Sequence, residues 1–425
     1  MLAVGLPLVV TTGLWIMSKY SDPTVLGQLT ATGTVAQLVG LYSVVLMAIG
    51  LLMTTRSSMV EAIYGGLDKS FRLHRRLGEV AITLAIVHLV ALIPETRKLV
   101  TLILPFTSSW WKTVGAFAIW GFIILGLLAL WKRIPYQIWL SIHKWIGVPF
   151  LLTCVHGFFA TSDILGYEPL RTWMLLWMAL GSGAWIYRTF IYKAAGPRYD
   201  YVVAESTPRG NDTWDLLLRP TNVRMNYEPG KFAFISVKNS PGLPDEQHPF
   251  SISSSPVRRE LRFSYKMLGD YTRALGSVQK GSQVEVYGPF GQFTLHQLGE
   301  FRRLVWIAGG IGITPFLSML AFETTNDDFR KIFLFYAVKK DEDAVYDKEI
   351  TEQISAADSY IDYVKWVSSE RGTLSADAII AETGPIDDYA IMVCGPPAMA
   401  RALEKQFLAK GFRPDRIVYE DFAFR

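Results

Sequence analysis

Two apolar stretches of this chain carry histidines at nearly equal spacing: HRRLGEVAITLAIVH at residues 74–88 and HKWIGVPFLLTCVH at residues 143–156. The first runs from His74 to His88 and the second from His143 to His156, whereas the whole chain has only 6 histidines. Separations of 14 and 13 residues are close to a whole number of helical turns, so each pair lies on roughly one face of its helix. The rise between the two members is about 20 Å, most of the thickness of a bilayer core.

This arrangement is the one expected for two haems stacked across a membrane, each iron held by one imidazole from each helix. A single intramembrane histidine often does no more than bond a neighbouring helix or line a cavity, but two pairs at matched spacing favour metal ligation. Gly78 and Gly147 lie four residues after His74 and His143 and share their helix faces, where a missing side chain lets a flat macrocycle approach the backbone. No Cys-x-x-Cys-His sequence is present, so the predicted haems are non-covalent and b-type.

The two halves of the chain differ in composition. Up to Pro197 there are 15 Lys and Arg against 7 Asp and Glu, with long apolar runs, and the remainder has 27 against 31. The net charge of +4 therefore averages a basic membrane half and a mildly acidic soluble half. No basic stripe indicates a nucleic-acid partner. Cys154 lies in an apolar stretch and Cys394 in the soluble half, so a disulfide between them is not expected.

Six stretches of residues 1–197 are apolar enough to be membrane helices. They are Leu2–Met17, Val35–Met53, Phe71–Ile93, Trp111–Trp131, Ile138–Ala160 and Trp173–Tyr192. The first has no basic start and no clear cleavage site, so it is not interpreted as a signal peptide. We predict a membrane all-α six-helix bundle with two haems for this domain.

The charges of the loops predict the orientation of the bundle, because cytoplasmic loops carry an excess of Lys and Arg. The richer side has Arg56, Lys69, Arg72, Lys132, Arg133, Arg188 and Lys193; the other has Lys19, Arg97, Lys98 and Arg171. The soluble half emerges on the richer side, so we expect a multi-pass protein of the plasma membrane with that half in the cytoplasm. The third and fifth helices then run parallel. We therefore expect His74 to pair with His143 near the cytoplasm, and His88 with His156 near the outside.

Residues 198–300 are expected to form a small antiparallel barrel, since short strands alternate with turns. The predicted strands are Tyr199–Ala204, Thr213–Leu218, Lys231–Val237, Leu261–Lys266 and Gln283–Tyr287.

Two segments of this predicted barrel carry chemistry. In residues 248–253, HPFSIS, an aromatic ring followed by a hydroxyl can stack on a flavin and reach its N5 edge. In residues 269–273, GDYTR, glycine and threonine at the start of a helix suit a pyrophosphate. Each signal alone is weak, because a Phe in a strand is usually a core residue and a Gly-x-x-Thr is usually a helix cap.

Residues 301–425 change to alternating strands and helices, with strands at Leu304–Ala308, Lys331–Ala337 and Ala390–Val393. The first strand leads into GGIGITP at residues 309–315 and a helix from about Phe316. Thr314 suits the N-cap and Pro315 the first helical position, and such a glycine turn lets a diphosphate approach the backbone.

The other two strands of this domain also end in candidate ligand-binding segments. The last strand ends in CGPP at residues 394–397, and ligands of open α/β sheets bind where strands end. Lys339 and Lys340 follow the middle strand. They suit a ribose 2′-phosphate about as well as they suit a solvated surface pair.

Taken in order, these motifs resemble those of the NADPH oxidase and ferric reductase superfamily, over nearly the whole chain. The ordered combination is specific: paired histidines, HPFSIS, GGIGITPF, CGPP and a terminal aromatic residue. The chain is most similar to compact, single-chain prokaryotic NADPH oxidase homologues. That resemblance implies a six-helix haem domain followed by a ferredoxin-reductase-like module, in which an FAD-binding β-barrel precedes an NADPH-binding α/β domain.

The resemblance also implies roles for individual residues. His74, His88, His143 and His156 are the haem ligands. The residues expected to bind FAD are His248, Pro249, Phe250, Ser251, Ser253, Gly269 and Thr272. Those expected to bind the dinucleotide are Gly309, Gly310, Gly312, Thr314, Pro315, Lys339, Gly395 and Pro396. Two residues are expected to be catalytic, with Cys394 beside the nicotinamide and Phe424 over a flavin face.

The function that follows is transfer of electrons from cytosolic NADPH, through FAD and two b-type haems, to extracytoplasmic O2, with superoxide as the product. Membrane lipid is the expected environment, and no obligatory protein partner is evident. Two alternatives stay open. One is a ferric-chelate reductase with the same electron path, and the other is a subunit that delivers electrons to an extracytoplasmic partner protein.

Overall fold

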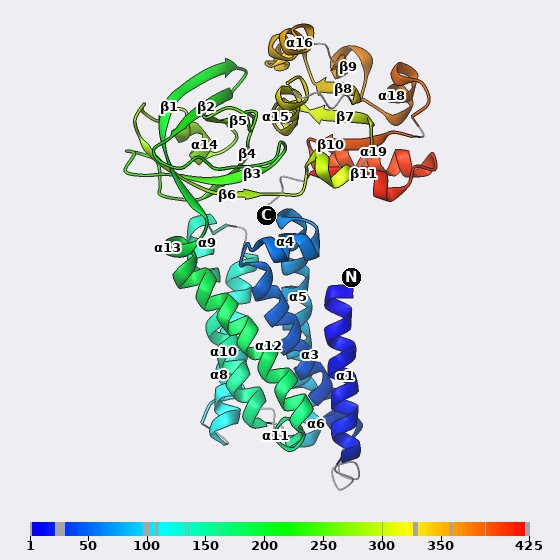
Figure 1. Cartoon of the computed structure of the whole chain (residues 1–425). Coiled ribbons are helices and arrows are strands. Elements are labelled where there is room, and N and C mark those ends of the chain that lie inside the picture. Colours follow the sequence, from blue (N-terminus) through cyan, green and yellow to red (C-terminus); the bar gives the residue numbers. More distant parts are fainter. Residues whose placement is uncertain are drawn as a thin grey trace. The chain divides into compact units, whose positions relative to one another are not determined.

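The computed structural model describes residues 2–21, 30–96, 103–106, 109–131, 133–134, 136–160, 162–299, 301–325, 330–357, 360–386 and 388–420. The chain divides into two compact units, Met1–Ala195 and Gly196–Arg425 (Figure 1). The first unit is helical, and the second contains two β-sheets. The boundary therefore falls where the last apolar helix ends and the first strand begins.

Helices cover nearly all of the six predicted apolar stretches. The long helices of the first unit are α1 (Leu2–Ser21), α3 (Ala31–Met53), α5 (Leu67–Ala91), α8 (Trp110–Leu130), α10 (Gly147–Ala160) and α12 (Glu168–Ile186). Shorter helices are α4 (Ser58–Tyr64), α6 (Ile93–Thr96), α9 (Tyr136–His143), α11 (Ser162–Gly166) and α13 (Tyr192–Ala195). A π-helical turn at Tyr187–Ile191 joins α12 to α13.

Four helical segments among the described residues are long and apolar enough to cross a membrane: Leu2–Ser21, Ala31–Met53, Trp110–Ala129 and Gln137–Ala160. The helices α5 and α12 fall outside this group. Their charged side chains explain why, since Arg75, Arg76 and Glu79 lie along α5 and α12 carries Glu168 and Arg171 in its first turn. Membrane crossing by these two helices, and hence the six-span bundle, stays a prediction.

The predicted fifth helix is interrupted just after His143. There α9 ends and a 3₁₀ turn, Lys144–Ile146, leads into α10. Pro149 gives the physical reason, because it lacks the amide hydrogen that an unbroken helix would direct at the Trp145 carbonyl. Trp185 of α12 donates an indole hydrogen bond of 2.7 Å to the Lys144 carbonyl at this break.

One of the basic residues used to predict orientation proves to be buried. Lys19 was expected in an outer loop, but α1 extends to Ser21 and the Lys19 side chain is ion-paired with Asp163 of α11. The longer helix is the reason for this correction, because it carries Lys19 into contact with neighbouring helices. Arg97, Lys98 and Lys132 lie outside the described residues.

The first sheet of the second unit is antiparallel and has the strand order β4-β3-β6-β1-β2-β5. Its strands are β1 (Arg198–Gly210), β2 (Thr213–Pro220), β3 (Phe232–Val237), β4 (His248–Ser251), β5 (Leu261–Lys266) and β6 (Gln283–Phe290). An isolated bridge between Ile252 and Phe263 brings the two edges together, so the sheet is curled. Five strands agree with the predicted ones, and β4, which holds most of the HPFSIS segment, is the additional one.

The second sheet is parallel, with the order β11-β10-β7-β8-β9. Its strands are β7 (Arg303–Gly309), β8 (Lys331–Val338), β9 (Ile361–Val367), β10 (Ala390–Cys394) and β11 (Ile417–Glu420). The helices that cover it are α15 (Thr314–Glu323), α16 (Asp347–Ser355), α18 (Ala376–Thr383) and α19 (Pro397–Ala409).

Alternation along β7 shows how the helices are distributed over the sheet. Trp306 belongs to a core shared with Phe316 of α15 and Ile350 of α16. Its neighbour Ile307 belongs to a second core with Phe407 of α19. Because successive side chains of a strand point to opposite faces, α15 and α16 cover one face and α18 and α19 the other. This layering places the carboxyl ends of β7 and β10 side by side.

Candidate functional site

The four histidines of the first unit meet as the two predicted pairs. The ring centres of His74 and His143 are 6.1 Å apart, and those of His88 and His156 are 6.3 Å apart. Two metal–imidazole bonds of about 2.0 Å, with each ring centre roughly 1.1 Å behind its nitrogen, give a separation of about 6 Å. Each pair is therefore spaced as two imidazoles on opposite sides of one metal ion would be.

Backbone carbonyls orient three of these four rings. The Nδ1 atoms of His74, His88 and His156 each lie 2.8 Å from the carbonyl oxygen of Gly50, Ala36 and Trp111, respectively. A carbonyl only accepts, so each Nδ1 carries the proton and the Nε2 lone pair is left for a metal. This is the arrangement usual for histidine ligands, and it fits haem iron at both sites.

Glycines on neighbouring helices make these hydrogen bonds possible. A Cβ added at Gly115 of α8 would lie 2.6 Å from Nδ1 of His156, and one at Gly40 of α3 would lie 3.0 Å from Nδ1 of His88. At Gly50 the corresponding distance to His74 is 3.6 Å. The backbones of α3 and α8 can thus approach the rings closely.

His143 is held differently from the other three. Its Nδ1 is buried and has no hydrogen-bond partner among the described residues. The ring instead stacks on Trp139, one turn earlier in α9, with ring centres 4.8 Å apart and planes inclined by 9°. The inner pair therefore has one ring fixed by a carbonyl and one fixed by an aromatic neighbour.

The two glycines expected to border the macrocycles differ. A Cβ at Gly78 would meet no atom within 4 Å, which agrees with an open helix face there. Gly147 does not have an open face, because a Cβ there would lie 2.2 Å from the indole of Trp185. The small size of Gly147 allows α10 to pack on α12. The prediction from spacing, that Gly147 leaves room for a macrocycle, is therefore wrong.

In the second unit, the expected flavin residues line one stretch of the barrel. Phe250 packs edge-on against Tyr265, with ring centres 5.6 Å apart. Ser251 is buried, and its hydroxyl has no hydrogen-bond partner among the described residues. A buried hydroxyl without a partner is unfavourable, so this atom fits a site that a bound polar edge completes. Pro249 lies between His248 and Phe250 in β4.

His248 is placed at the start of β4 by two contacts. Its ring stacks on Tyr271 of α14 (Asp270–Leu275) with centres 3.6 Å apart, and its Nε2 lies 3.1 Å from a carboxylate oxygen of Glu246. Burial lowers the pKa of His248 below its ordinary value, and the Glu246 carboxylate opposes this shift.

Three other expected FAD residues make contacts within the protein. The Thr272 hydroxyl accepts hydrogen bonds of 3.0 Å from the amides of Leu268 and Gly269 and donates one to the Gly269 carbonyl, so this pair caps α14. The Ser253 hydroxyl lies 3.1 Å from Nε of Arg262 and 2.8 Å from the Ser264 hydroxyl.

The two glycine turns expected at the dinucleotide touch each other. Ala308 of β7 lies opposite Cys394 of β10, so the turns that follow these strands are adjacent. A Cβ at Gly312 would lie 2.3 Å from the Cys394 carbonyl oxygen, and one at Gly395 would lie 2.9 Å from Cα of Gly309. Only glycine allows this approach of backbone to backbone.

The first of these turns keeps one open side. Gly310 has a φ of +55°, and a Cβ there would meet nothing within 4 Å. Thr314 was predicted to be the N-cap, but it is the first residue of α15. The reason is that a 3₁₀ turn at Gly310–Ile313 starts the helical path earlier. The Thr314 hydroxyl lies 3.1 Å from the Ile311 carbonyl, and Pro315 follows in the first turn. Pro396 immediately precedes α19.

Cys394 and Glu420 form a buried pair at the ends of adjacent strands. They are partners in the parallel register of β10 and β11, and Cys394 is fully buried. Burial, and then the charge of Glu420, raise the pKa of the Cys394 thiol well above its ordinary value, so the thiol is protonated. Sequence analysis missed Glu420, because only the strand register brings it to Cys394. Phe424 lies outside the described residues.

Lys339 is available for a ligand phosphate. It follows β8, its side chain is exposed, and it makes no ion pair with a described residue. Lys340 differs, since its ammonium group lies 3.2 Å from Glu342. Of the two lysines, Lys339 fits the predicted 2′-phosphate contact better.

Three family models match consecutive parts of the chain. A ferric reductase like transmembrane component matches residues 39–154, an FAD-binding domain matches residues 205–306, and an oxidoreductase NAD-binding domain matches residues 306–405. The first match contains His74, His88 and His143 and ends just before His156.

Individual relatives resemble part of the chain. Sulfhydrogenase 2 subunit gamma of Pyrococcus furiosus is 26% identical over 45% of this chain and 70% of its own. The reductase component of propane 2-monooxygenase of Rhodococcus jostii is 25% identical over 52% of this chain, and the chain spans only 62% of its length. The solved structure of flavohemoglobin from Malassezia yamatoensis, with bound FAD and heme, covers 92% of this chain and 99% of its own, at 15% identity and a TM-score of 0.54. This last similarity concerns the fold alone.

These matches agree with the order of the two units. A ferric-reductase-like transmembrane domain precedes a module that binds FAD and NAD. The chain is therefore a membrane electron-transfer oxidoreductase.

Proposed function

We propose that this chain, which has the domain architecture of the NADPH oxidase and ferric reductase superfamily, moves electrons from cytosolic NADPH through FAD and two bis-histidine b haems to extracytoplasmic O2, forming superoxide. The observation that carries the proposal is the spacing of 6.1 and 6.3 Å within the two histidine pairs. Two one-electron carriers in series suit a path through lipid better than a path within a soluble enzyme. The proposed location is the plasma membrane, with the second unit in the cytoplasm.

The residues of the first unit would hold the haems in fixed orientations. His74 with His143, and His88 with His156, would each hold one of the two haems through their ring nitrogens. The carbonyls of Gly50, Ala36 and Trp111 hold three of the rings in the tautomer that exposes Nε2. When bound, the haems and the flavin supply the one-electron and two-electron carriers of this path.

The residues of the second unit would position the nicotinamide and the flavin. The glycine turns at Gly309–Gly312 and Gly395 bring bare backbone to the phosphates. The neutral Cys394 thiol and the Glu420 carboxylate lie at the strand ends, where the nicotinamide is expected. The Ser251 hydroxyl would meet the flavin edge, and the exposed Lys339 would meet a 2′-phosphate.

Purified protein tests the proposal directly. It should hold two low-spin b haems and one FAD, oxidise NADPH, and reduce cytochrome c in a reaction that superoxide dismutase suppresses. Replacing His88 or His156 should remove the outer haem and leave FAD and nucleotide binding unchanged. A haem content of one per chain in the unmodified protein would contradict the two-haem path.

A second candidate is a ferric-chelate reductase with the same electron path, which the matched family description favours. Reduction of an added ferric chelate separates the two, because direct transfer from the protein is insensitive to superoxide dismutase, whereas reduction through superoxide is suppressed by it.

A third candidate is an electron-delivery subunit, since relatives are named as reductase or electron transfer components of larger systems. Oxidation of NADPH by the pure chain with O2 alone would exclude an obligatory protein partner.

A further inference from the structure

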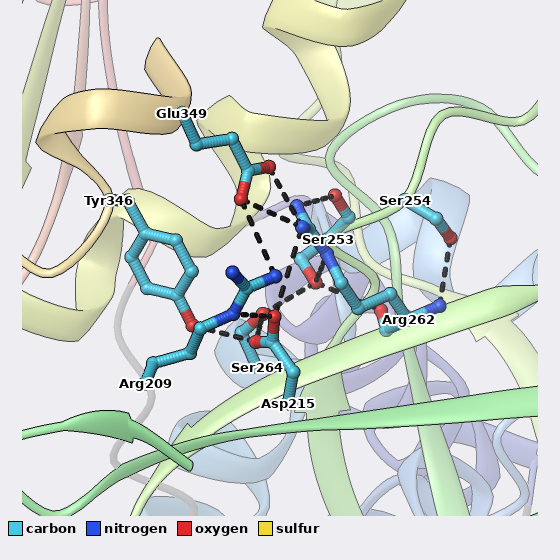
Figure 2. A network of polar contacts seen from close by, with 8 residues as sticks. All are labelled: Arg209, Asp215, Ser253, Ser254, Arg262, Ser264, Tyr346 and Glu349. Atoms are coloured by element: carbon cyan, nitrogen blue, oxygen red, sulfur yellow. Dashed lines mark hydrogen bonds and ion pairs between the residues drawn. The ribbon is translucent and has the colours of Figure 1, made fainter. Parts of the chain in front are cut away.

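A partly buried network of polar side chains joins the curled sheet to the α/β domain within the second unit. Figure 2 shows its members converging from both sides, with the side chains of Arg209 and Arg262 between Glu349 at the top and Asp215 at the bottom. From the barrel side come Arg209, Asp215, Ser253, Ser254, Arg262 and Ser264, and from the α/β side come Tyr346 and Glu349. We call these eight residues the interdomain network.

Asp215 of β2 is the acceptor at the centre of this network. One carboxylate oxygen accepts hydrogen bonds from the Ser264 hydroxyl at 2.6 Å and the Tyr346 hydroxyl at 2.8 Å. The other accepts from Nε of Arg209 at 2.6 Å. Asp215 is 3% exposed and Tyr346 is 1% exposed. A polar group this deeply buried is unfavourable unless it is hydrogen-bonded, and the three donors meet this need, with the Tyr346 hydroxyl directed at the carboxylate.

Arg262 of β5 forms a second arm that starts at the flavin segment. Its guanidinium donates to the hydroxyl and the carbonyl of Ser253, each at 3.1 Å. On its other side it lies 2.8 Å from a carboxylate oxygen of Glu349, in the first turn of α16. The last residue of HPFSIS is thus connected to α16 through a single side chain, and a planar guanidinium leaves little freedom in such a connection.

Two further contacts cross the same interface. The Ser318 hydroxyl of α15 donates to the Ser254 carbonyl at 2.5 Å. The Asn211 amide, at the β1–β2 turn, donates to the Glu342 carbonyl in the 3₁₀ turn Asp341–Asp343. These contacts reach the helix that follows the glycine turn and the turn that follows Lys339. The contacts made by Arg262, Ser318 and Asn211 therefore each end next to a segment that binds a ligand in the proposed function.

We infer that the interdomain network is a positioning device, which sets the distance and angle between the nicotinamide and the flavin and thereby the rate of hydride transfer. This inference rests on the proposed function only as far as flavin reduction. The step is balanced within the site: the C4–H bond of the reduced nicotinamide breaks, its hydride forms a bond to flavin N5, and the oxidised nucleotide is released. Of the network residues only Ser253 is among those expected to bind FAD. Asp215, Tyr346 and Glu349 are expected to contact neither reactant, so their effect is on geometry.

The test compares two tyrosine variants that each lose one hydrogen bond to an aspartate. Tyr346→Phe removes the bond to Asp215 across the interface. Tyr363→Phe is the matched control, because the Tyr363 hydroxyl donates to Asp347 of α16 at 2.6 Å, within the α/β domain. In anaerobic stopped-flow mixing of the full-length holoprotein with NADPH, Tyr346→Phe should slow flavin reduction by about tenfold or more, since a small misplacement of reactants is costly. Tyr363→Phe should leave the rate unchanged.

If the network only stabilised the fold, its loss would lower the thermal stability and leave the limiting rate of flavin reduction unchanged. The inference expects the FAD content and the affinity for NADP⁺ to stay the same in Tyr346→Phe, while the limiting rate alone falls. It also expects hydrogen exchange to accelerate at the amides of residues 209–216 and 346–350 together. Equal rates in the two variants, or lost thermal stability with an unchanged limiting rate, would overturn it. Glu349→Gln removes the charge and one acceptor of the other arm while keeping the side-chain shape, and it should give the same kinetic pattern if Tyr346→Phe folds poorly.

Failure of the positioning role can be distinguished from failure of the proposed function. Normal flavin reduction without superoxide formation would contradict the proposed function and leave the positioning role intact. A protein that binds FAD but accepts no hydride from NADPH or NADH would overturn both.

Discussion

Three of the paired imidazoles take their orientation from a carbonyl of a neighbouring helix. The hydrogen bond fixes the tautomer and the ring plane together, and partners of this kind also strengthen the metal bond. Such a hydrogen bond requires the backbone of the neighbouring helix to lie close to the imidazole ring. Gly115 stands opposite His156 and Gly40 opposite His88 for this reason. The glycines therefore belong to the candidate site although they would bind nothing themselves.

Gly115→Ala tests this role at the outer pair. The added Cβ would lie 2.6 Å from Nδ1 and 2.7 Å from Cε1 of His156, and the ring cannot retreat without losing the Trp111 carbonyl. We expect the outer site to lose haem affinity by about 10- to 100-fold, as for other supporting contacts of metal ligands. Pyridine haemochrome assays of purified protein would then give about one haem per chain in place of two.

The control for this substitution is Gly13→Ala in α1, where an added Cβ meets no atom within 4 Å. It should keep the full haem content. If both variants keep two haems, the close approach of α8 has no role in ligand positioning.

At the residue scale, the spacing of the histidines and the parallel course of the third and fifth helices together predicted both pairs, since periodicity in a helix fixes which residues share a face. The supporting residues could not be predicted in this way. Gly40, Gly50 and Gly115 lie on other helices, and their relation to the histidines exists only after packing. For Gly147 the prediction from spacing was wrong. It lies one turn after His143, but it faces the indole of Trp185 and not an open surface.

At the element scale, polar contacts join the ends of three helices in the first unit. The Lys19 ammonium group of α1 is ion-paired with Asp163 of α11 and donates to the Gln37 side chain of α3 at 2.7 Å. The side chains of Lys19 and Asp163 are each 5% exposed. Gln37 follows Ala36, whose carbonyl orients His88. The ion pair thus fixes the end of α3 next to the outer histidine pair.

Asp163→Asn should destabilise this unit strongly, because it leaves a buried ammonium group without its counter-charge. Breaking such a pair costs about 3–5 kcal/mol, whereas replacing both partners by apolar residues is often nearly neutral. The double variant Lys19→Met, Asp163→Leu should therefore recover most of the loss. Thermal unfolding in detergent, followed by tryptophan fluorescence, measures both effects.

Asp68→Asn is the control for the ion-pair experiment, because Asp68 pairs with Arg72 one turn away in the same helix and that guanidinium is 29% exposed. Its loss should cost less than about 1 kcal/mol. Similar effects of Asp163→Asn and Asp68→Asn would mean that burial of the Lys19 pair contributes little.

The elements themselves were largely predictable, and the differences have local causes. Apolar length marked the helices, and glycine turns marked the strand-to-helix joints of the α/β domain. The strand β4 was not predicted because it is only 4 residues long and contains Pro249. The sequence indicates Thr314 as the N-cap, whereas it is the first residue of the helix, since the 3₁₀ turn that precedes α15 has no distinct sequence signal. Glu420 was missed because its contact with Cys394 depends on strand register.

At the scale of the whole molecule, the sequence order of motifs predicted the sequence order of modules. Three family models follow one another over residues 39–154, 205–306 and 306–405. The interdomain network was not foreseen, because its members come from five separate segments with no common motif. The acceptor was not predictable for a related reason: no residue pattern distinguishes O2 from a ferric chelate at the outer end of the path.

The proposed path has an electrical consequence that a soluble oxidoreductase would not have. Electrons that cross the bilayer carry negative charge, and moving one charge through the full field is worth about 2.3 kcal/mol per 100 mV. In sealed proteoliposomes given NADPH outside and ferricyanide inside, molecules with their second unit outward should reduce the internal ferricyanide. They should also make the lumen negative. The growing potential should slow turnover, and valinomycin with potassium should restore it.

His156→Ala provides the comparison for the vesicle experiment, because it lacks one ligand of the proposed outer haem. It should still reduce ferricyanide added outside, since flavin reduction does not need that site, but it should leave the internal ferricyanide oxidised and the potential unchanged. Internal reduction by unmodified protein without any charge movement in tight vesicles would show that the electrons travel with a neutralising proton or a diffusing carrier. Equal internal reduction by the unmodified protein and by His156→Ala would show that the outer histidine pair lies off the path.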